Sequence, residues 1–158
     1  MQSKLKLRRA IIAAILLVIT AFITVNIKNT IDSKDPEKSL PIISVSVGYN
    51  PPYVVRAGYT WKFGNKTVMS PYVDVSDAAL MVTDAYPETN IVILLTAPEK
   101  AVRLYESPVQ AEPEFRQISE WVTPKEEGKY YYKVEADFED GNILYYFEIE
   151  VKKENLQS

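Results

Sequence analysis

The chain has 158 residues, enough for one modest domain with an appendage, and its 47% apolar content excludes the composition of a disordered protein. It contains no cysteine and no histidine, which excludes disulfides, a lipid-modified cysteine anchor, thiolate metal sites, cysteine nucleophiles and the most common general base. We therefore expect a protein that is not an enzyme and has no catalytic residue, no cofactor and no metal site.

Charge is divided unevenly along the chain, whose net value is −3. Residues 1–27 contain Lys4, Lys6, Arg8 and Arg9 and no acidic residue, so the remainder carries a net charge of −7. A net-acidic domain lacks the clustered lysines and arginines that neutralise nucleic-acid phosphates. We expect no nucleic-acid partner.

An uncharged apolar segment, residues 10–27, follows this basic cluster. About 18 apolar residues just span the hydrocarbon layer as a helix, and this segment has no polar face of the kind that a core helix shows. It predicts a transmembrane signal-anchor helix, so the lipid bilayer is the first expected partner. By the positive-inside rule, residues 1–9 form a cytoplasmic tail and the C-terminal part lies outside.

A cleavable signal peptide is the alternative interpretation of the same segment. Cleavage after Ala21 would give a secreted protein, but Ile19 occupies the −3 position, where a small residue is expected. The apolar run also continues to Ile27, longer than a usual signal core. We favour the uncleaved anchor, and both interpretations place the rest of the chain outside the cytoplasm.

Residues 28–40 are polar and charged, which predicts a short linker beside the membrane. Residues 41–153 form the predicted domain, and residues 154–158 a tail. In the domain, short β-branched or aromatic runs alternate with Pro, Gly, Asn and Asp. The expected strands are 42–47, 53–56, 59–63, 66–69, 91–96, 101–105, 117–122, 128–138 and 143–151, with a Gly64-Asn65 turn.

Two of these segments carry more specific expectations. Residues 91–96 are apolar on both faces, which is typical of a central strand buried on both sides. Residues 77–82, DAALMV, are ambiguous and fit a single helical turn. About seven to nine short strands with no helix beyond the anchor predict an all-β fold, an antiparallel β-sandwich.

The last forty residues predict a long hairpin. Asp140-Gly141 favours a two-residue type I′ turn. The cross-strand pairs on one face are then Phe138–Ile143, Ala136–Tyr145, Val134–Phe147, Tyr132–Ile149 and Tyr130–Val151, all apolar or aromatic. The other face sets Lys133 against Glu148 and Tyr131 against Glu150. A turn at Gly141-Asn142 keeps the same faces but opposes two glutamates, so we favour the first register.

Tyr130 opens the penultimate strand two residues after Gly128 and shortly after Pro124. This spacing is that of a tyrosine corner, in which the tyrosine hydroxyl closes the turn before the strand, and it favours an immunoglobulin-like topology.

Three segments carry a resemblance to a known group of domains: Pro51-Pro52, GYTW at 58–61, and WVTPKEEGKYYYKVEADFEDGNILYYFEIEVKK at 121–153. Together they resemble the small immunoglobulin-like extracytoplasmic β domains of Gram-positive bacterial surface proteins and of some penicillin-sensing membrane receptors. The likeness covers about 100 residues, most of it in the terminal hairpin. It implies a fold and a bacterial cell-surface location. That group has no defined activity, so no catalytic residue is implied.

Aromatic residues are the candidates for ligand or partner contact. Tyr131 and Tyr146 lie on the outward face of the predicted hairpin, and Tyr105 and Trp121 lie near strand ends. Such residues stack on sugars or peptides, but they also favour sheets for packing alone, and we expect Trp61 in the core.

Four carboxylates share one face of the hairpin: Glu135, Asp137, Glu148 and Glu150. Two of them could pair for acid–base chemistry, but with Lys133 between them a solvated surface is the favoured interpretation. The acidic turn at 137–142 departs from a calcium-binding loop, because Ala136 and Phe147 occupy ligand positions.

The leading functional hypothesis is a membrane-anchored, non-catalytic binding module that contacts a membrane protein, a cell-surface protein or a wall polymer. The alternatives are a structural or assembly accessory of a membrane complex and a carboxylate-dependent cell-wall hydrolase. A hydrolase needs two carboxylates in a cleft, which a small sandwich rarely provides.

Overall fold

The computed structural model describes residues 2–153, with side chains from residue 9 onward, so the predicted tail at 154–158 lies outside the described residues. Residues up to Ser39, together with Lys62–Val68, form one compact unit, and the rest of the described chain forms a second. Each unit is described separately below.

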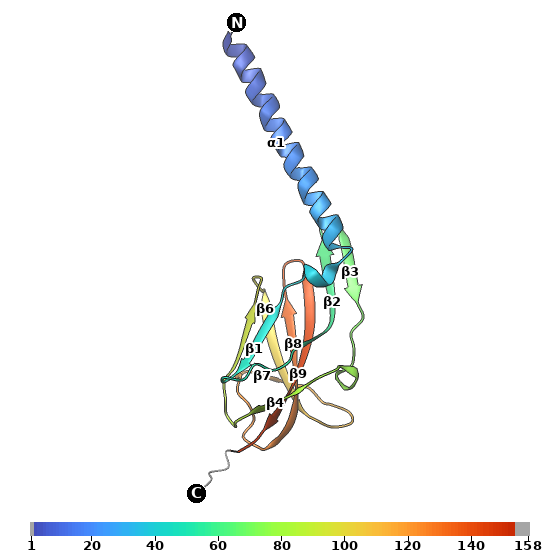
Figure 1. Ribbon diagram of the computed structural model, residues 1–158, viewed down its shortest axis with the longest axis vertical. Helices are drawn as coiled ribbons and strands as arrows, with labels where there is room; N and C mark the ends of the chain where they lie inside the picture. Colours follow the sequence, from blue (N-terminus) through green and yellow to red (C-terminus); the bar gives the residue numbers. More distant parts are fainter. Residues whose placement is uncertain (1, 154–158) are drawn as a thin grey trace. The chain divides into compact units, whose positions relative to one another are not determined.

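A single long helix, α1 (Gln2–Asp32), holds the apolar segment (Figure 1). Its stretch Arg9–Asp32 has 24 residues and contains an 18-residue window with a mean hydropathy of 2.7 and no buried residue. A helix of that length rises about 36 Å, enough to cross a bilayer. The chain therefore has one apolar N-terminal helix that fits a membrane anchor or a signal sequence.

The helix continues five residues beyond the predicted span, through Lys28–Asp32 of the expected linker. Nothing there breaks a helix, because the first proline, Pro36, comes later and opens the short 3₁₀ turn η1 (Pro36–Lys38). The Thr30 hydroxyl also donates to the Asn26 carbonyl at 2.9 Å, which holds a polar side chain along the last turns.

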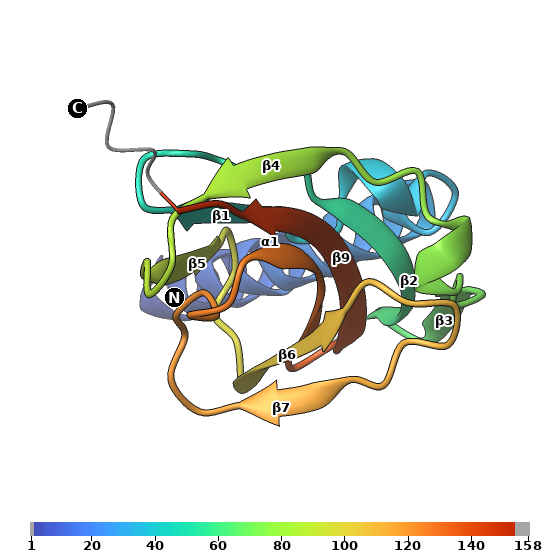
Figure 2. The ribbon, with the colours of Figure 1, turned by 90° about the horizontal axis from the view of Figure 1, so that it is seen from below.

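Nine strands are found in the described residues. They are β1 (Ile43–Val47), β2 (Val55–Phe63), β3 (Lys66–Ser70), β4 (Val82–Ala85), β5 (Ile91–Leu95), β6 (Ala101–Pro108), β7 (Arg116–Ile118), β8 (Gly128–Asp137) and β9 (Gly141–Val151). β1 and β5 make a two-stranded antiparallel sheet. The larger sheet has the order β3-β2-β9-β8-β6-β7 (Figure 1). β4 pairs in parallel with β9 (Figure 2). The prediction of a mostly antiparallel β domain behind one apolar helix is confirmed.

Two local expectations need adjusting. The two runs at 53–56 and 59–63 belong to one strand, β2, whose register shifts between Arg56 and Gly58 as in a β-bulge. The ambiguous segment 77–82 is largely extended: a 3₁₀ turn, η2 (Val75–Asp77), precedes it, and β4 starts at Val82.

The core of the second unit lies on the inner face of β8 and β9. Alternate residues of both strands are buried there, and Tyr132 stacks on Phe147 with ring centroids 4.9 Å apart. Burial of each such side chain contributes about 1.5–3 kcal/mol. From β9, the Tyr145 hydroxyl donates to the Pro41 carbonyl just before β1, at 2.9 Å. Trp61 is buried as predicted and meets Phe138 edge-on at 5.3 Å.

The predicted hairpin register is wrong by two residues. Ala136 pairs with Ile143 and Asp137 with Asn142, and three residues, 138–140, connect the two strands. The cause is Gly141, which pairs with Trp61 of β2 so closely that a Cβ on it would stand 2.0 Å from the Thr60 carbonyl oxygen. Pairing with β2 draws Gly141 out of the turn and into the sheet.

A shift of two residues preserves the face of every side chain, so the predicted inner and outer faces hold. The outer-face partners change: Lys133 lies opposite Tyr146, and Tyr131 opposite Glu148.

β5 is not the doubly buried strand that its sequence predicts. Ile91 is buried, but Val92 is 47% and Leu94 65% exposed. The strand lies in the two-stranded sheet, whose outward face meets solvent, and only the inward side chains reach the core.

The tyrosine corner is confirmed. The Tyr130 hydroxyl donates to the Glu126 carbonyl oxygen at 3.2 Å and closes the turn that leads into β8.

Candidate functional site

The outer face of β6, β8 and β9 collects polar side chains from three neighbouring strands. Residues directly opposite one another in antiparallel strands lie on the same face, so Arg103 of β6 lies beside Glu135 of β8, which lies beside Leu144 of β9. One pair further along, Asp137 lies beside Asn142. The ladder register alone brings a guanidinium, two carboxylates and an amide together.

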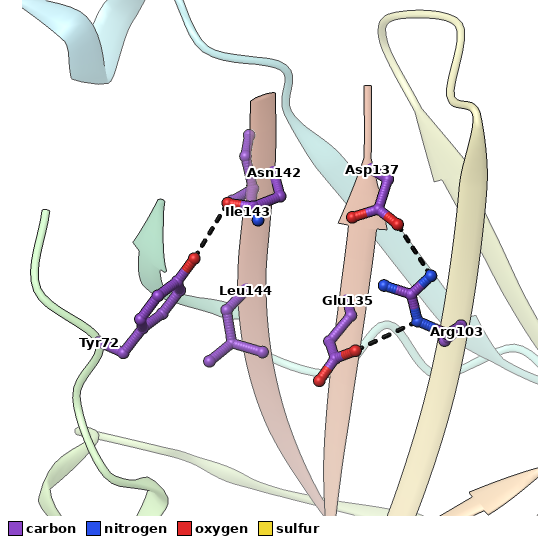
Figure 3. Close-up of a pocket in the computed structure, with 7 residues that line it drawn as sticks. All are labelled: Tyr72, Arg103, Glu135, Asp137, Asn142, Ile143 and Leu144. Carbon is purple, nitrogen blue, oxygen red and sulfur yellow. Dashed lines mark hydrogen bonds and ion pairs between the residues drawn. The ribbon is translucent and has the colours of Figure 1, made fainter. Parts of the chain in front are cut away.

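Arg103 holds two carboxylates at once (Figure 3). Its Nε donates to Glu135 Oε2 at 3.2 Å, and its Nη1 lies 2.8 Å from Asp137 Oδ2. Hydrogen bonds to Asp137 and then Glu135 raise the pKa of the guanidinium above its usual value. About a third of each of the three side chains is exposed, so the pairs are partly shielded from water.

Glu135 is the most heavily bonded residue of this group. Besides Arg103, its Oε2 accepts a hydrogen bond from the Tyr105 hydroxyl at 3.0 Å, and its Oε1 lies 2.9 Å from Lys133 Nζ. Burial pushes the pKa of Glu135 upward, but the hydrogen bonds from Lys133, Tyr105 and Arg103 outweigh it and lower the pKa. The carboxylate is therefore ionised at neutral pH, the wrong state for a general acid.

A cavity of about 340 Å³ opens beside this ion-pair group (Figure 3). We call it the trough; it is lined by Tyr72, Arg103, Glu135, Asp137, Asn142, Ile143 and Leu144. Tyr72 stands on one side of Leu144, and the charged residues of β8 and β6 stand on the other. Its volume is within the usual range for ligand pockets, about 300–1,000 Å³.

Gly58 makes room for the aromatic wall of the trough. The Val73 amide donates to the Ala57 carbonyl at 2.8 Å, which ties the segment after β3 to the bulge in β2. A Cβ on Gly58 would lie 2.6 Å from the Tyr72 ring and 2.9 Å from its Cα. The hydroxyl of Tyr72 then reaches Asn142 Oδ1 at 3.0 Å, so an aromatic ring that is 53% exposed is held at both ends.

Three of the four predicted aromatic residues lie on or beside this face. The Tyr105 hydroxyl donates a hydrogen bond to Glu135, and the Lys133 ammonium lies over the Tyr105 ring in a cation–π contact, 4.2 Å from the centroid. Tyr146 is covered: it is 6% exposed and stacks with Phe115 at 6.0 Å, and burial raises the pKa of its hydroxyl. It is therefore a packing residue.

Tyr131 is half-buried and packs against a second small core formed by Ala57, Val75 and Tyr146. Trp121 lies elsewhere, half-buried beside the start of β5, where its carbonyl accepts a hydrogen bond from the Ile91 amide at 2.8 Å. The structure does not bring Trp121 to the trough, and neither residue lines it.

The four hairpin carboxylates separate into two pairs. Glu135 and Asp137 are ion-paired with Arg103, and about a third of each side chain stays exposed to solvent. Glu150 instead meets Lys152 at 3.0 Å, and Glu148 lies opposite Tyr131.

Sequence reasoning missed Tyr72, Arg103 and Asn142 as site residues. Arg103 left a signal, since it is the one basic residue of an alternating apolar strand, on the same face as Tyr105. The sequence contains no comparable signal for Tyr72, because this residue lies in an irregular segment without a strand periodicity.

No group of three or more His, Cys, Asp or Glu side chains suited to a metal ion occurs in the part of the chain whose side chains are described. Comparison with protein-family models, with curated proteins and with solved structures gives no match to this chain.

Proposed function

We propose that this chain is a membrane-anchored, extracytoplasmic binding module of immunoglobulin-like fold that acts without catalysis. The observation that carries the proposal is the helix stretch Arg9–Asp32: it contains an apolar window of 18 residues, none of which is buried, and it follows a basic N-terminus and precedes a β domain. Burying such a helix in lipid removes its apolar surface from water, and the basic tail keeps the N-terminus in the cytoplasm.

Two features support the immunoglobulin-like assignment. The order β9-β8-β6 gives three antiparallel neighbours that carry the inner core, and a second, smaller sheet is formed by β1 and β5. The tyrosine corner at Tyr130 opens β8, where such domains have it. The resemblance to Gram-positive extracytoplasmic domains adds a cell-surface location.

The charges in the trough support a binding role over hydrolysis. A carboxylate-dependent hydrolase needs one carboxyl group with a raised pKa to act as the acid. Glu135 has a lowered pKa, and Arg103 bridges it to Asp137. Such a group offers fixed donors and acceptors to a partner, which we take to be a membrane protein, a cell-surface protein or a wall polymer.

The absence of native cysteine gives a clean test of topology. Single cysteines are introduced at Ser3 in the N-terminal tail and at the exposed Glu99 in the β domain. In intact cells, a membrane-impermeant maleimide should label Glu99→Cys, and it should label Ser3→Cys only after the membrane is permeabilised. Labelling of Ser3→Cys alone in intact cells would overturn the proposal.

A further inference from the structure

We infer that the trough binds a neutral, hydroxyl-rich ring of the kind found in polysaccharides. This inference rests on the proposed binding role and names its ligand. The trough combines one fixed aromatic wall with several hydrogen-bonding groups opposite it, across a short apolar floor. A sugar ring has that pattern: its C–H groups form an apolar face, and its hydroxyls lie around the edge.

The aromatic wall is exposed and immobilised. Tyr72 is 53% exposed, yet its backbone lies against Gly58 and its hydroxyl is bonded to Asn142. Exposing an aromatic ring to water has a cost, and fixing it in advance removes part of the ordering cost when a ligand binds. The ring stands beside Leu144, so a flat apolar face can rest between these two side chains.

The opposite wall offers donors and acceptors at fixed positions. Arg103 is a pure donor, and each carboxylate of Glu135 and Asp137 has about four lone-pair sites, more than its ion pairs use. Asn142 lies beside Tyr72 rather than in this wall: its amide oxygen accepts the hydrogen bond from the Tyr72 hydroxyl, and its amide nitrogen adds a donor. Hydroxyl groups both donate and accept, so they can meet all these groups together.

The charges favour a neutral ligand over an anionic one. The trough contains one guanidinium and two carboxylates, and each has an opposite charge within 3.2 Å. A phosphate or sulfate would have to replace Glu135 or Asp137 on Arg103 and leave a partly buried carboxylate unpaired. A neutral polyol adds hydrogen bonds and breaks no ion pair.

The position of the trough argues against an extended peptide. A peptide strand commonly binds at a sheet edge, where unpaired backbone groups receive it. The trough lies on a sheet face, with β8 between two paired neighbours, β9 and β6.

The test uses the full-length chain in lipid nanodiscs and isothermal titration, with empty nanodiscs as the blank. The neutral probes are cellohexaose, chitohexaose and dextran; dextran sulfate is the anionic counterpart of dextran, and a pool of random octapeptides represents peptides. We expect at least one neutral saccharide to bind. Tyr72→Ala should weaken that binding about tenfold, because it removes the aromatic contact. Tyr72→Phe should retain it within about threefold, since the ring remains.

Tyr49→Ala is the matched control, because Tyr49 is fully exposed and does not line the trough. Its affinity should equal that of the natural chain, and thermal unfolding should show that all three variants fold. The inference is overturned if no neutral saccharide binds, if dextran sulfate or the octapeptides bind more tightly than the neutral probes, or if Tyr72→Ala has no effect. Such a failure is distinguishable from failure of the proposed function, because cysteine labelling tests the anchor and location independently.

Discussion

At the scale of single residues, the outer face of the sheet is organised around ionised side chains that are neither fully exposed nor fully buried. Arg103, Lys133 and Tyr105 converge on the carboxylate of Glu135. Water screens such pairs only in part, so their attraction is stronger than that of an exposed ion pair, while their desolvation cost is smaller than that of a fully buried one. The group fixes one side of the trough.

Glu135 is expected to make the free energy of unfolding depend on pH in the acid range. Its pKa in the folded chain lies below the ordinary value of 4.5, so the stability it contributes is present above about pH 4.5 and is lost as the pH falls through the folded pKa. We expect the urea midpoint to fall between pH 5 and pH 3, and Glu135→Gln to lessen that fall. Glu139→Gln is the control: its pKa is also lowered, by Lys100, but its side chain is 82% exposed, so the change should be smaller. An unchanged pH dependence in Glu135→Gln would contradict this assignment.

Tyr132 is stabilising through its ring and destabilising through its hydroxyl. The side chain is completely buried, and its hydroxyl has no hydrogen-bond partner among the described residues. A buried polar group left unpaired costs about 1–3 kcal/mol. We expect Tyr132→Phe, which keeps the stack on Phe147, to raise the free energy of unfolding by about 1 kcal/mol. Chemical denaturation measures this, and a loss of stability would show that the hydroxyl has a partner. Tyr145→Phe, which removes the bond to Pro41, should destabilise instead.

At the scale of elements, the terminal hairpin is positioned by a third strand. β2 pairs with β9 through Gly141 and Asn142, and with this pairing the hairpin register lies two residues from the one that the Asp140-Gly141 turn favours. The same strand carries the bulge and Gly58, which admit Tyr72 to the trough. Register and site therefore depend on one contact between strands that are far apart in sequence.

Substitution at the hairpin tip separates the two registers. Gly141→Ala would place a methyl group 2.0 Å from the Thr60 oxygen, so we expect a loss of at least about 2 kcal/mol in the free energy of unfolding. Asp140→Ala, at an exposed turn position, should cost less than about 0.5 kcal/mol. Equal effects of the two substitutions would favour the two-residue Asp-Gly turn.

At the scale of the whole molecule, the apolar helix and the β domain each have their own physical requirement. The helix stretch Arg9–Asp32 exposes a continuous apolar surface, whereas the β domain buries its own core. A soluble protein rarely exposes apolar surface of that extent. The helix is therefore expected either to lie in a lipid bilayer or to be cleaved off as a signal peptide.

An uncleaved anchor predicts how the protein behaves on extraction. Alkaline carbonate should leave the chain in the membrane pellet, detergent should release it, and its mass should be that of the full sequence. A shorter protein in the medium, beginning at Phe22, would support the signal-peptide interpretation. Replacing Leu17 by Arg provides the control, because a charge at the centre of the span weakens anchoring.

Local patterns in the sequence were sufficient to identify the apolar helix, most strands, the two faces of the hairpin and the closing bond of Tyr130, because each depends on residues close together in the chain. Periodicity of two assigns a side chain to a face without knowledge of its partner. The sequence also predicted that Trp61 is buried, because a large apolar side chain in a strand gains most from the core.

Only the tertiary structure decided the register at Gly141, the exposure of Leu94, the burial of Tyr146 under Phe115, and the placing of Tyr72 and Arg103 in the lining of one cavity. Each of these depends on what lies next to the residue in the folded chain. β2 pairs with β9, solvent meets the outer face of β5, and Phe115 stacks on Tyr146. Local preferences are worth a few tenths of a kcal/mol to about 1 kcal/mol, and a clash or a buried stack outweighs them. The sequence by itself determined the helix and the β character of this protein, and long-range packing determined the trough.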